Sequence, residues 1–346
     1  MTQRSSKVLI RDVAAHAGVS VTTVSHVLND VPGKRISPKT RDRVRSAAEE
    51  LGYAPNGVAR SLRLQRSQMI GLVSDEIATT PYAGQIILGA QEAASKRGWL
   101  LMLVNTGVDV EFEAAEIQAL RQRQVDGFLY ARMFHQVVTL PPSLAGVPTV
   151  LLDARTADLS VPSVVPDEEA GGRRATDELI RHGHTRIAFL NNADDIPATR
   201  GRLRGYRAAL AEAGIAYDDR WVVAAASDTD GGLTAARQLL SGPDRPTALF
   251  CFNDRMAMGA YHAAAERGLR IPDDLSVIGF DNQEIIADGL RPRLTTLALP
   301  HYEMGAWAVE TLIRHIDGLG RDGPDSVTMN CPLVVRDSVA APPPID

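Results

Sequence analysis

From Met69 onwards, short apolar runs alternate with longer stretches of helical periodicity. This order is typical of parallel β-sheets covered by helices on both faces. About 280 residues are too many for one such sheet, so we predict two α/β lobes of about 130 residues each. The apolar runs lie at 69–73, 99–104, 125–130, 147–152, 186–190, 248–252 and 275–280, and the helical stretches at 84–97, 111–123, 168–182, 199–213, 230–240 and 254–267.

The first 66 residues differ from this body in both pattern and charge. They hold 12 Lys and Arg against 5 Asp and Glu, a net charge of +7, whereas the remaining 280 residues hold 25 against 37, a net of −12. The overall net charge of −5 conceals this division. A basic segment joined to an acidic body indicates that only the first segment meets a polyanion.

Three short helices are predicted in the basic segment. Gly18 ends the first, Ser20 caps the second, and Ser37-Pro38 begins the third, which stops at Gly52. Their periodicity turns these apolar side chains inward: Ile10, Val13, Ala14 and Ala17, then Val24, Val27 and Leu28, then Val44, Ala47, Ala48 and Leu51. The second helix turns a polar and almost uncharged face outward, made of Thr22, Ser25, His26 and Asn29.

Two helices joined by a tight turn that contains glycine, and supported by a third, form a helix-turn-helix. The second helix of this motif enters the major groove, where hydroxyl, imidazole and amide groups reach base edges. The nearby basic residues suit phosphate contacts. A three-helix bundle with an incidental polar face is the alternative, and the coincidence of polar face, turn and basic surroundings favours DNA binding.

A short basic stretch follows at 57–63, GVARSLR. A helix of this length is marginal in water, so composition alone favours a linker.

The run IRDVAAHAGVSVTTVSHVLND…ISPKTRDRVRSAAEELGYAPNGVARSL resembles the LacI/GalR family of bacterial transcription factors, and the similarity continues through nearly the whole chain. The resemblance implies that the second helix reads an operator. It also implies that 57–63 form a hinge helix on DNA, where Leu62 wedges into a central minor-groove step, and this replaces the linker interpretation. The DNA-binding residues expected from it are Ser20, Val21, Thr22, Thr23, Ser25, His26, Asn29, Asn56, Arg60, Leu62 and Arg63.

The predicted fold class is therefore an all-α helix-turn-helix head followed by a two-lobed α/β body with parallel sheets. The resemblance implies the type I periplasmic-binding-protein fold for the body. We predict a DNA-binding domain at 1–54, a hinge helix and linker at 55–67, and a ligand-binding and dimerisation domain at 68–346. The chain is expected to cross between lobes near 166, 297 and 328, so that lobe 1 comprises about 68–166 and 298–328, and lobe 2 about 167–297 and 329–340.

Polar side chains follow several predicted strands, namely Asp75, Asn105, Asp153, Asn253 and Asp281. Ligands of open α/β sheets bind at the carboxyl ends of the strands, which here would face the cleft between the lobes. For each residue the alternative role is to cap a helix or close a loop.

The resemblance assigns ligand contacts to Arg202, Asn253 and Asp281, and an aromatic position to Tyr82. Such a set can form paired hydrogen bonds with adjacent sugar hydroxyls while a ring packs on the apolar face of the sugar. Leu299 and His301 stand where the lac repressor has glutamine and phenylalanine, and the acidic Asp75-Glu76 pair disfavours an anionic effector such as a sugar phosphate.

The sequence lacks the motifs that would indicate other classes of protein. Cys251 and Cys331 cannot form a CxxC metal site and suggest a reducing compartment. His182 and His184 have no third metal ligand near them in the sequence, so no metal is expected. There is no nucleotide-binding glycine motif and no nucleophile elbow, so neither a cofactor nor a catalytic residue is predicted. A sugar-modifying α/β enzyme fused to a DNA-binding head is a remote alternative.

No apolar stretch approaches the roughly 18–20 residues that span a bilayer. The first residues, MTQRSSKVLIRDVAAHAG, carry charges throughout, unlike a secretory signal. We therefore expect no membrane partner and a cytoplasmic protein, associated with the nucleoid when it is bound to its operator.

Together these features predict a sequence-specific transcriptional repressor controlled by a small-molecule effector, a sugar or oligosaccharide that acts as inducer. The alternative is a corepressor-dependent regulator that responds to a purine or another metabolite, since both kinds share the residues named above. A homodimer on a near-palindromic operator is expected. The chain ends CPLVVRDSVAAPPPID, without the apolar heptad tail that builds a tetramer.

Overall fold

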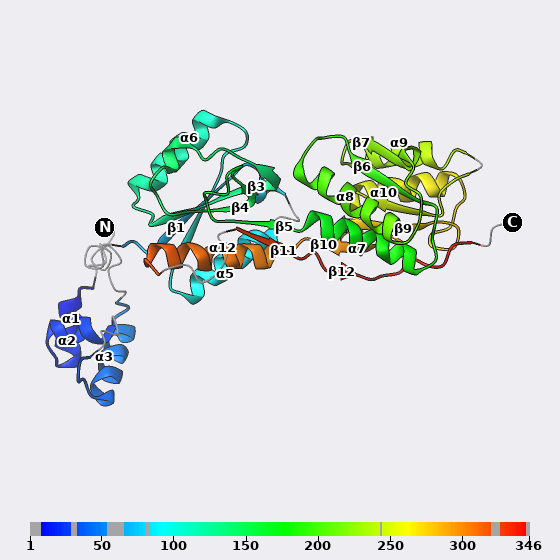
Figure 1. The fold of residues 1–346 in the computed structure, drawn as a ribbon. Helices are drawn as coiled ribbons and strands as arrows, with labels where there is room; N and C mark the ends of the chain where they lie inside the picture. Colours follow the sequence, from blue (N-terminus) through cyan, green and yellow to red (C-terminus); the bar gives the residue numbers. More distant parts are fainter. Residues whose placement is uncertain are drawn as a thin grey trace, which may run out of the picture. The chain divides into compact units, whose positions relative to one another are not determined.

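The computed structural model describes residues 8–28, 33–53, 66–80, 84–242, 244–319 and 326–343. The chain divides into two compact units, Met1–Ser67 and Gln68–Asp346, which we call the head and the body and describe separately (Figure 1). None of the helices in the described ranges is long and apolar enough to cross a membrane.

The described part of the head contains α1 (Ile10–Ala17), α2 (Val21–Leu28) and α3 (Pro38–Glu50). Their apolar faces meet in one small core, as the periodicity predicts. The fully buried members of that core are Val13, Ala14, Ala17, Val24, Val27, Val44, Ala47 and Ala48.

The turn between α1 and α2 has the geometry that its residues favour. Gly18 adopts a left-handed backbone with φ of +62°, which a side chain would disfavour, and the Val19 N–H donates to the Ala14 carbonyl at 3.0 Å. Ser20 then accepts a hydrogen bond from the Thr23 N–H at 3.1 Å, and Ser37 accepts one from the Thr40 N–H at 3.2 Å at the start of α3. The predicted caps are thus present.

The body holds two six-stranded sheets, counted over the described residues, and each forms the centre of one lobe. The sheet of lobe 1 has the order β11-β5-β4-β3-β1-β2 and all its neighbours are parallel. Helices α5 and α12 cover one of its faces and α6 covers the other. The elements of lobe 1 are β1 (Met69–Ser74), η1 (Ile77–Thr79), α5 (Gly84–Lys96), β2 (Leu100–Asn105), α6 (Val110–Gln122), β3 (Gly127–Val137), η3 (Pro142–Leu144), β4 (Thr149–Arg155), β5 (Ser163–Pro166), α12 (His301–Ile316) and β11 (Ser326–Met329).

The sheet of lobe 2 has the order β12-β10-β9-β8-β6-β7. Its strands are parallel except β12, which pairs with β10 in the antiparallel sense. Helices α7 and α8 form one packed pair and α9 and α10 another, on opposite faces of the sheet. The elements of lobe 2 are α7 (Glu168–Arg181), β6 (Ile187–Asn192), α8 (Pro197–Glu212), η4 (Asp219–Trp221), β7 (Val222–Ala225), α9 (Thr229–Leu239), β8 (Ala248–Cys251), α10 (Asp254–Glu266), β9 (Ser276–Asp281), α11 (Glu284–Ala287), β10 (Thr295–Ala298) and β12 (Leu333–Val334).

The described chain passes between the lobes after β5, after β10 and after β11. Figure 1 shows the result: α12, late in the sequence, lies beside α5 under the first sheet. The sequence prediction included no strands at β5, β7, β10, β11 and β12, each of which has four residues or fewer.

Glycines bring the helices of lobe 2 into backbone contact. A Cβ at Gly172 of α7 would lie 2.4 Å from the Arg202 carbonyl oxygen of α8, and one at Gly205 of α8 would lie 2.1 Å from the Glu169 carbonyl oxygen of α7. A Cβ at Gly201 would lie 2.6 Å from the Glu168 Cβ. The two helices therefore approach as closely as their backbones allow, and this places Glu168 next to Arg202.

Replacement of Gly172 by alanine should force α7 and α8 apart, because no side chain that could give way lies between the helices. We expect Gly172→Ala to lower the free energy of unfolding by about 3 kcal/mol, measured by urea denaturation. Gly84→Ala is the matched control, since a Cβ at Gly84 meets nothing within 4 Å. Equal stability of the two variants would contradict the backbone contact.

Candidate functional site

The head presents one polar surface on α2. Val21 is 44% exposed and Thr22 is exposed, whereas Ser25 and His26 are half-buried on the outward side of a helix whose Val24 and Val27 are buried. Of the other predicted contacts on this helix, Ser20 and Thr23 join their hydroxyls at 2.9 Å at its N-terminus. Four further expected DNA-binding residues at 56–63 (Asn56, Arg60, Leu62 and Arg63), together with Asn29, lie outside the described residues.

Basic side chains lie near this surface in the same unit. Lys34 and Arg35 precede α3, and Lys39, Arg43 and Arg45 lie on it, all exposed. Exposed cations around an uncharged helix face suit a duplex, because phosphate contacts position a protein while the groove-facing side chains read bases.

The body contains a hollow of about 100 Å³ between the carboxyl ends of its two sheets. Lobe 1 contributes the ends of β3, β4 and β5, and lobe 2 the ends of β6, β8 and β9. The predicted residues Asp153, Arg202, Asn253 and Asp281 all line it, together with Phe134, His135, Glu168, Asn192, Asp194, Ser227, Phe252, Arg255 and Leu299.

Arg202 is the central charged group of this hollow. Its guanidinium carbon lies 3.6 Å from the centroid of the Phe280 ring and 4.4 Å from that of Phe252. Its Nε donates to Glu168 Oε2 at 2.7 Å, and its Nη1 donates to the Phe252 carbonyl and lies 3.5 Å from Asp281 Oδ1. The side chain is 4% exposed, so this buried cation depends on the two carboxylates for compensation.

Two aspartates face this cation from opposite lobes. Both have a left-handed backbone, with φ of +52° at Asp153 and +100° at Asp281, a strained conformation of the kind that concentrates at functional sites. Burial raises the pKa of Asp281 to about 6, although Arg202 acts in the opposite direction. Burial and the neighbouring Glu168 raise the pKa of Asp153 well above its ordinary value, and its Oδ1 has no hydrogen-bond partner among the described residues.

Asn253 has a structural task as well as a place in the hollow. Its Oδ1 accepts from the Met256 N–H at 2.9 Å, which caps α10, and its Nδ2 donates to the Ser227 carbonyl at 3.0 Å. Capping was the alternative role considered for this residue, and the structure combines it with a position in the hollow.

Asp75 and Asn105 do not belong to the lining of this hollow. Asp75 Oδ1 accepts from the Glu76 N–H at 2.8 Å, and Asn105 Oδ1 accepts from the Ala78 N–H at 3.4 Å. Both residues close the loop after β1. In the order of the sheet, β1 and β2 lie beyond β3 and β4, so their carboxyl ends are farther from the hollow. Tyr82 lies outside the described residues.

Sequence reasoning missed Glu168 and His135. Glu168 is the first residue of α7, directly after the first crossing between the lobes. A carboxylate at this position is explained by its favourable interaction with the helix dipole, so nothing in the sequence indicated a role in the site. His135 lies near the end of β3, beyond the apolar run that predicted the strand. The two departures from the lac repressor have distinct places: Leu299 lines the hollow, and His301 lines an adjoining one with Gln85.

A polar head surface and a charged cleft between two α/β lobes define a DNA-binding regulator with a ligand-sensing body. Two family models match the chain: periplasmic binding proteins and sugar binding domain of the LacI family over residues 67–337, and bacterial regulatory proteins of the lacI family over residues 9–56. The chain belongs to the LacI family of bacterial regulatory proteins. Members are transcriptional repressors with small-molecule effectors and not enzymes, as predicted.

Similar proteins include curated relatives and a solved structure. The chain is 36% identical to the HTH-type transcriptional repressor PurR of Vibrio vulnificus over 95% of this chain and 98% of the relative. It is 37% identical to the ribose operon repressor of Escherichia coli K12 over 89% and 92%. The crystal structure of the lac repressor dimer bound to operator and the anti-inducer ONPF matches with a TM-score of 0.76 at 28% identity, over 97% of this chain and 100% of that one.

The raised pKa of Asp281 predicts a pH dependence of stability. The native state holds this proton up to about pH 6, whereas the unfolded chain releases it near pH 4, so the stabilisation from the protonated form is lost as the pH rises between them. Relative to Asp281→Asn, the wild type should lose about 1 kcal/mol of unfolding free energy between pH 5 and pH 7.5. Urea denaturation of both proteins at the two pH values measures this difference, and parallel behaviour would contradict the shift.

Proposed function

We propose that this protein is a homodimeric repressor that binds a near-palindromic operator and changes its affinity for DNA when a polyhydroxylated ligand, a sugar or oligosaccharide, binds between the lobes. The proposal rests on one observation: Asp153 of lobe 1 lines the same hollow as Arg202 and Asp281 of lobe 2. These groups come from elements far apart in the sequence, and a ligand between them contacts both lobes at once.

The chemistry of the hollow suits hydroxyl groups. Each hydroxyl donates one hydrogen bond and accepts others, so carboxylates, an amide and a guanidinium together can bind several hydroxyls on adjacent carbons. The ring of Phe134, which is 43% exposed and lines the hollow, offers an apolar surface for the face of a sugar. The ribose operon repressor among the relatives is named for the operon of a sugar, which supports the same ligand class for this chain.

A corepressor such as a purine is the second candidate. The same Phe134 ring could stack on a flat heterocycle, and PurR is among the relatives. The two candidates differ in the sign of the response: an inducer weakens operator binding, and a corepressor strengthens it. In either case the ligand and the operator must change each other's affinity by the same factor.

Exposed apolar side chains at one edge of lobe 1 support the dimer. The outermost strand β2 exposes Leu100 by 60% and Leu103 by 37%, and the neighbouring α5 exposes Leu88 by 43%. Unpaired edge strands with exposed apolar side chains are unfavourable in a lone molecule and favour pairing. A dimer would carry two heads, one for each half of the operator, in the bacterial cytoplasm and on the nucleoid.

The function of the cleft is tested by Arg202→Gln. A thermal-shift screen of monosaccharides, oligosaccharides and purines first identifies a ligand, because binding to the folded state raises its stability. We expect Arg202→Gln to lose the change in operator affinity that this ligand causes in the wild type, measured by fluorescence anisotropy, while operator binding without ligand stays within about threefold.

Arg207→Gln is the matched control, since Arg207 lies on the same helix, does not line the hollow, and pairs at the surface with Asp219 at 3.8 Å. Such a surface pair contributes little, so the control should respond to ligand like the wild type. An undiminished response in Arg202→Gln would overturn the placement of the ligand site.

The reading of DNA by α2 is tested at His26. Its replacement by alanine should change which bases are preferred at one position of each half-site, as measured by selection from a randomised operator library. Loss of a phosphate-type contact, as in Arg43→Ala, should instead weaken binding to all sequences and flatten its salt dependence. Unchanged base preference in the His26 variant would show that this helix face does not read the operator.

A further inference from the structure

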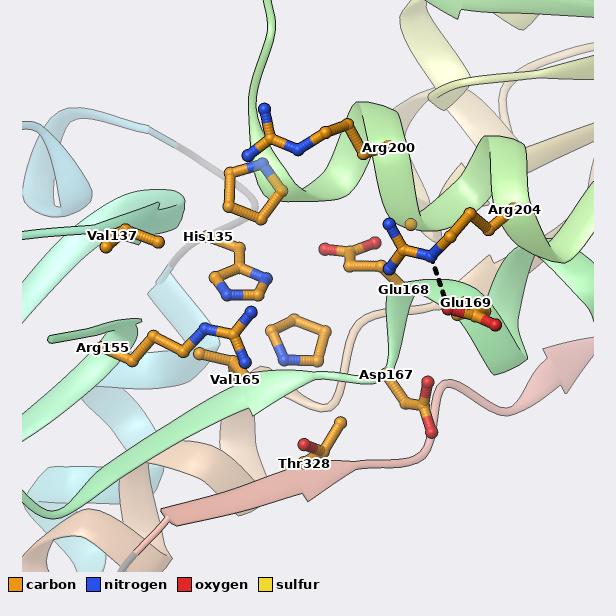
Figure 2. Close-up of a pocket in the computed structure, with 13 residues that line it drawn as sticks. His135, Val137, Arg155, Val165, Asp167, Glu168, Glu169, Arg200, Arg204 and Thr328 are labelled. Carbon is orange, nitrogen blue, oxygen red and sulfur yellow. Dashed lines mark hydrogen bonds and ion pairs between the residues drawn. The ribbon is translucent and has the colours of Figure 1, made fainter. Parts of the chain in front are cut away.

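A second hollow, of about 220 Å³, adjoins the ligand cleft on the side of the crossings between lobes (Figure 2). His135 lines both hollows, so the two are neighbours. Lobe 1 contributes His135 from β3 and Arg155 from the end of β4, and lobe 2 contributes Arg200 and Arg204 from the first turns of α8. The hollow therefore has basic groups on both of its walls.

The acidic side chains around this hollow are already engaged. Glu168 accepts from Arg202 at 2.7 Å, and Glu169 accepts from Arg204 Nε at 2.7 Å, the bond drawn in Figure 2. Asp167 Oδ1 accepts from the Ala170 N–H at 2.9 Å and caps α7. These pairings leave the basic groups of lobe 1 without carboxylate partners.

Two polar groups face the hollow with their hydrogen-bonding capacity unused. His135 is 5% exposed, and neither of its ring nitrogens has a hydrogen-bond partner among the described residues. The side chain of Arg155, at the end of β4, has no hydrogen bond or ion pair within the described part of the chain, and Figure 2 shows its guanidinium beside the imidazole. Burial of an imidazole without partners is unfavourable, which indicates a ligand that supplies them.

The electrostatic environment of the imidazole is positive. Burial, followed by Arg155, Arg202 and Arg200, lowers the pKa of His135 to about 4, so the ring is neutral at physiological pH and keeps one N–H donor. The first turn of α8, a helix of 16 residues, adds the positive end of its dipole on the same side. The arginine charges that oppose a proton on this ring attract an anion.

We propose that this hollow is a subsite for an acidic group, a carboxylate or a phosphate, carried by the hydroxylated effector. The proposal rests on the function proposed above and adds to it the charge of the ligand. Arg155 binds the acid group from lobe 1, Arg200 binds it from lobe 2, and the His135 N–H donates to it. The hydroxyls of the same ligand then occupy the adjoining hollow around Arg202.

The position of the two arginines links this subsite to cleft closure. Arg200 pairs with Asp195, whose side chain is 80% exposed, and such a surface pair is readily exchanged for a bound anion. An anion held by Arg155 and Arg200 bridges the lobes and favours the conformation in which they are close. The expectation that Asp75-Glu76 disfavours an anionic ligand does not apply here, because neither residue lines either hollow.

Inorganic phosphate provides a test that does not require the natural effector. The melting temperature of the full chain is measured in increasing phosphate at constant ionic strength, with chloride as the reference. We expect phosphate to stabilise the wild type and to bind Arg155→Gln at least tenfold more weakly. Arg220→Gln, at a position 87% exposed on lobe 2, should behave as the wild type. Absence of stabilisation in the wild type, or equal stabilisation in Arg155→Gln, would overturn the subsite.

Matched ligand pairs identify the acid group and separate this proposal from the function on which it rests. Galacturonate is compared with galactose, and ribose 5-phosphate with ribose, by their effect on operator affinity in the wild type and in Arg155→Gln. We expect an acidic member to act at tenfold or more lower concentration than its neutral partner, and Arg155→Gln to abolish that preference. The effective pair shows whether the group is a carboxylate or a phosphate.

A neutral sugar that acts as strongly as its acidic partner would overturn the subsite and leave the proposed function intact. Arg155→Gln that keeps the preference for the acidic member would do the same. The opposite result is also distinguishable. If the wild type binds phosphate through Arg155 but no ligand alters its affinity for the operator, the proposed function alone is contradicted.

Discussion

The buried guanidinium of Arg202 is the interaction on which the body of this protein depends. A charge this deep in the protein is tolerated only with well-placed counter-charges and hydrogen bonds, and here Glu168, Asp281 and the Phe252 carbonyl supply them. Each of these groups belongs to a different element of lobe 2, namely the start of α7, the end of β9 and the segment after β8. The pairing of Arg202 therefore fixes the ends of three elements around one point.

Helix packing makes that arrangement possible. Because Gly172, Gly201 and Gly205 let α7 and α8 touch through their backbones, the first turn of α7 lies beside Arg202. The lobe 2 half of the cleft is thus built before any ligand arrives. Lobe 1 brings the groups without full partners, Asp153, His135 and Arg155, to the opposite wall. One side of a bound ligand supplies the hydrogen bonds that the lobe 1 groups lack. Its other side contacts the paired groups around Arg202 in lobe 2, and binding to both lobes at once favours a closed cleft.

Much of the fold could be predicted from the sequence because its strongest patterns are local. The periodicity of α1, α2 and α3, the cap at Ser37 and the long apolar runs of β1, β4 and β9 each depend on near neighbours in the chain. The short strands could not be predicted in this way. The strand β5, SVVP, has four buried residues, of which the last is a proline, and a second proline directly precedes it. The strands β7 and β11 are half-exposed, and their pairing depends on a sheet assembled from distant segments.

The sequence by itself determined a basic helix-turn-helix head, an α/β body with parallel sheets, and several polar residues at the carboxyl ends of strands. These features follow from charge, periodicity and the geometry common to parallel sheets. Only the tertiary structure decided which polar residues share a site. It assigned Asp75 and Asn105 to loop closure, paired Arg202 with Glu168 across 34 positions, and placed His135 and Arg155 opposite Arg200. These contacts between distant residues depend on how closely the helices pack and on where the chain crosses between the lobes. No local pattern in the sequence encodes either of these properties.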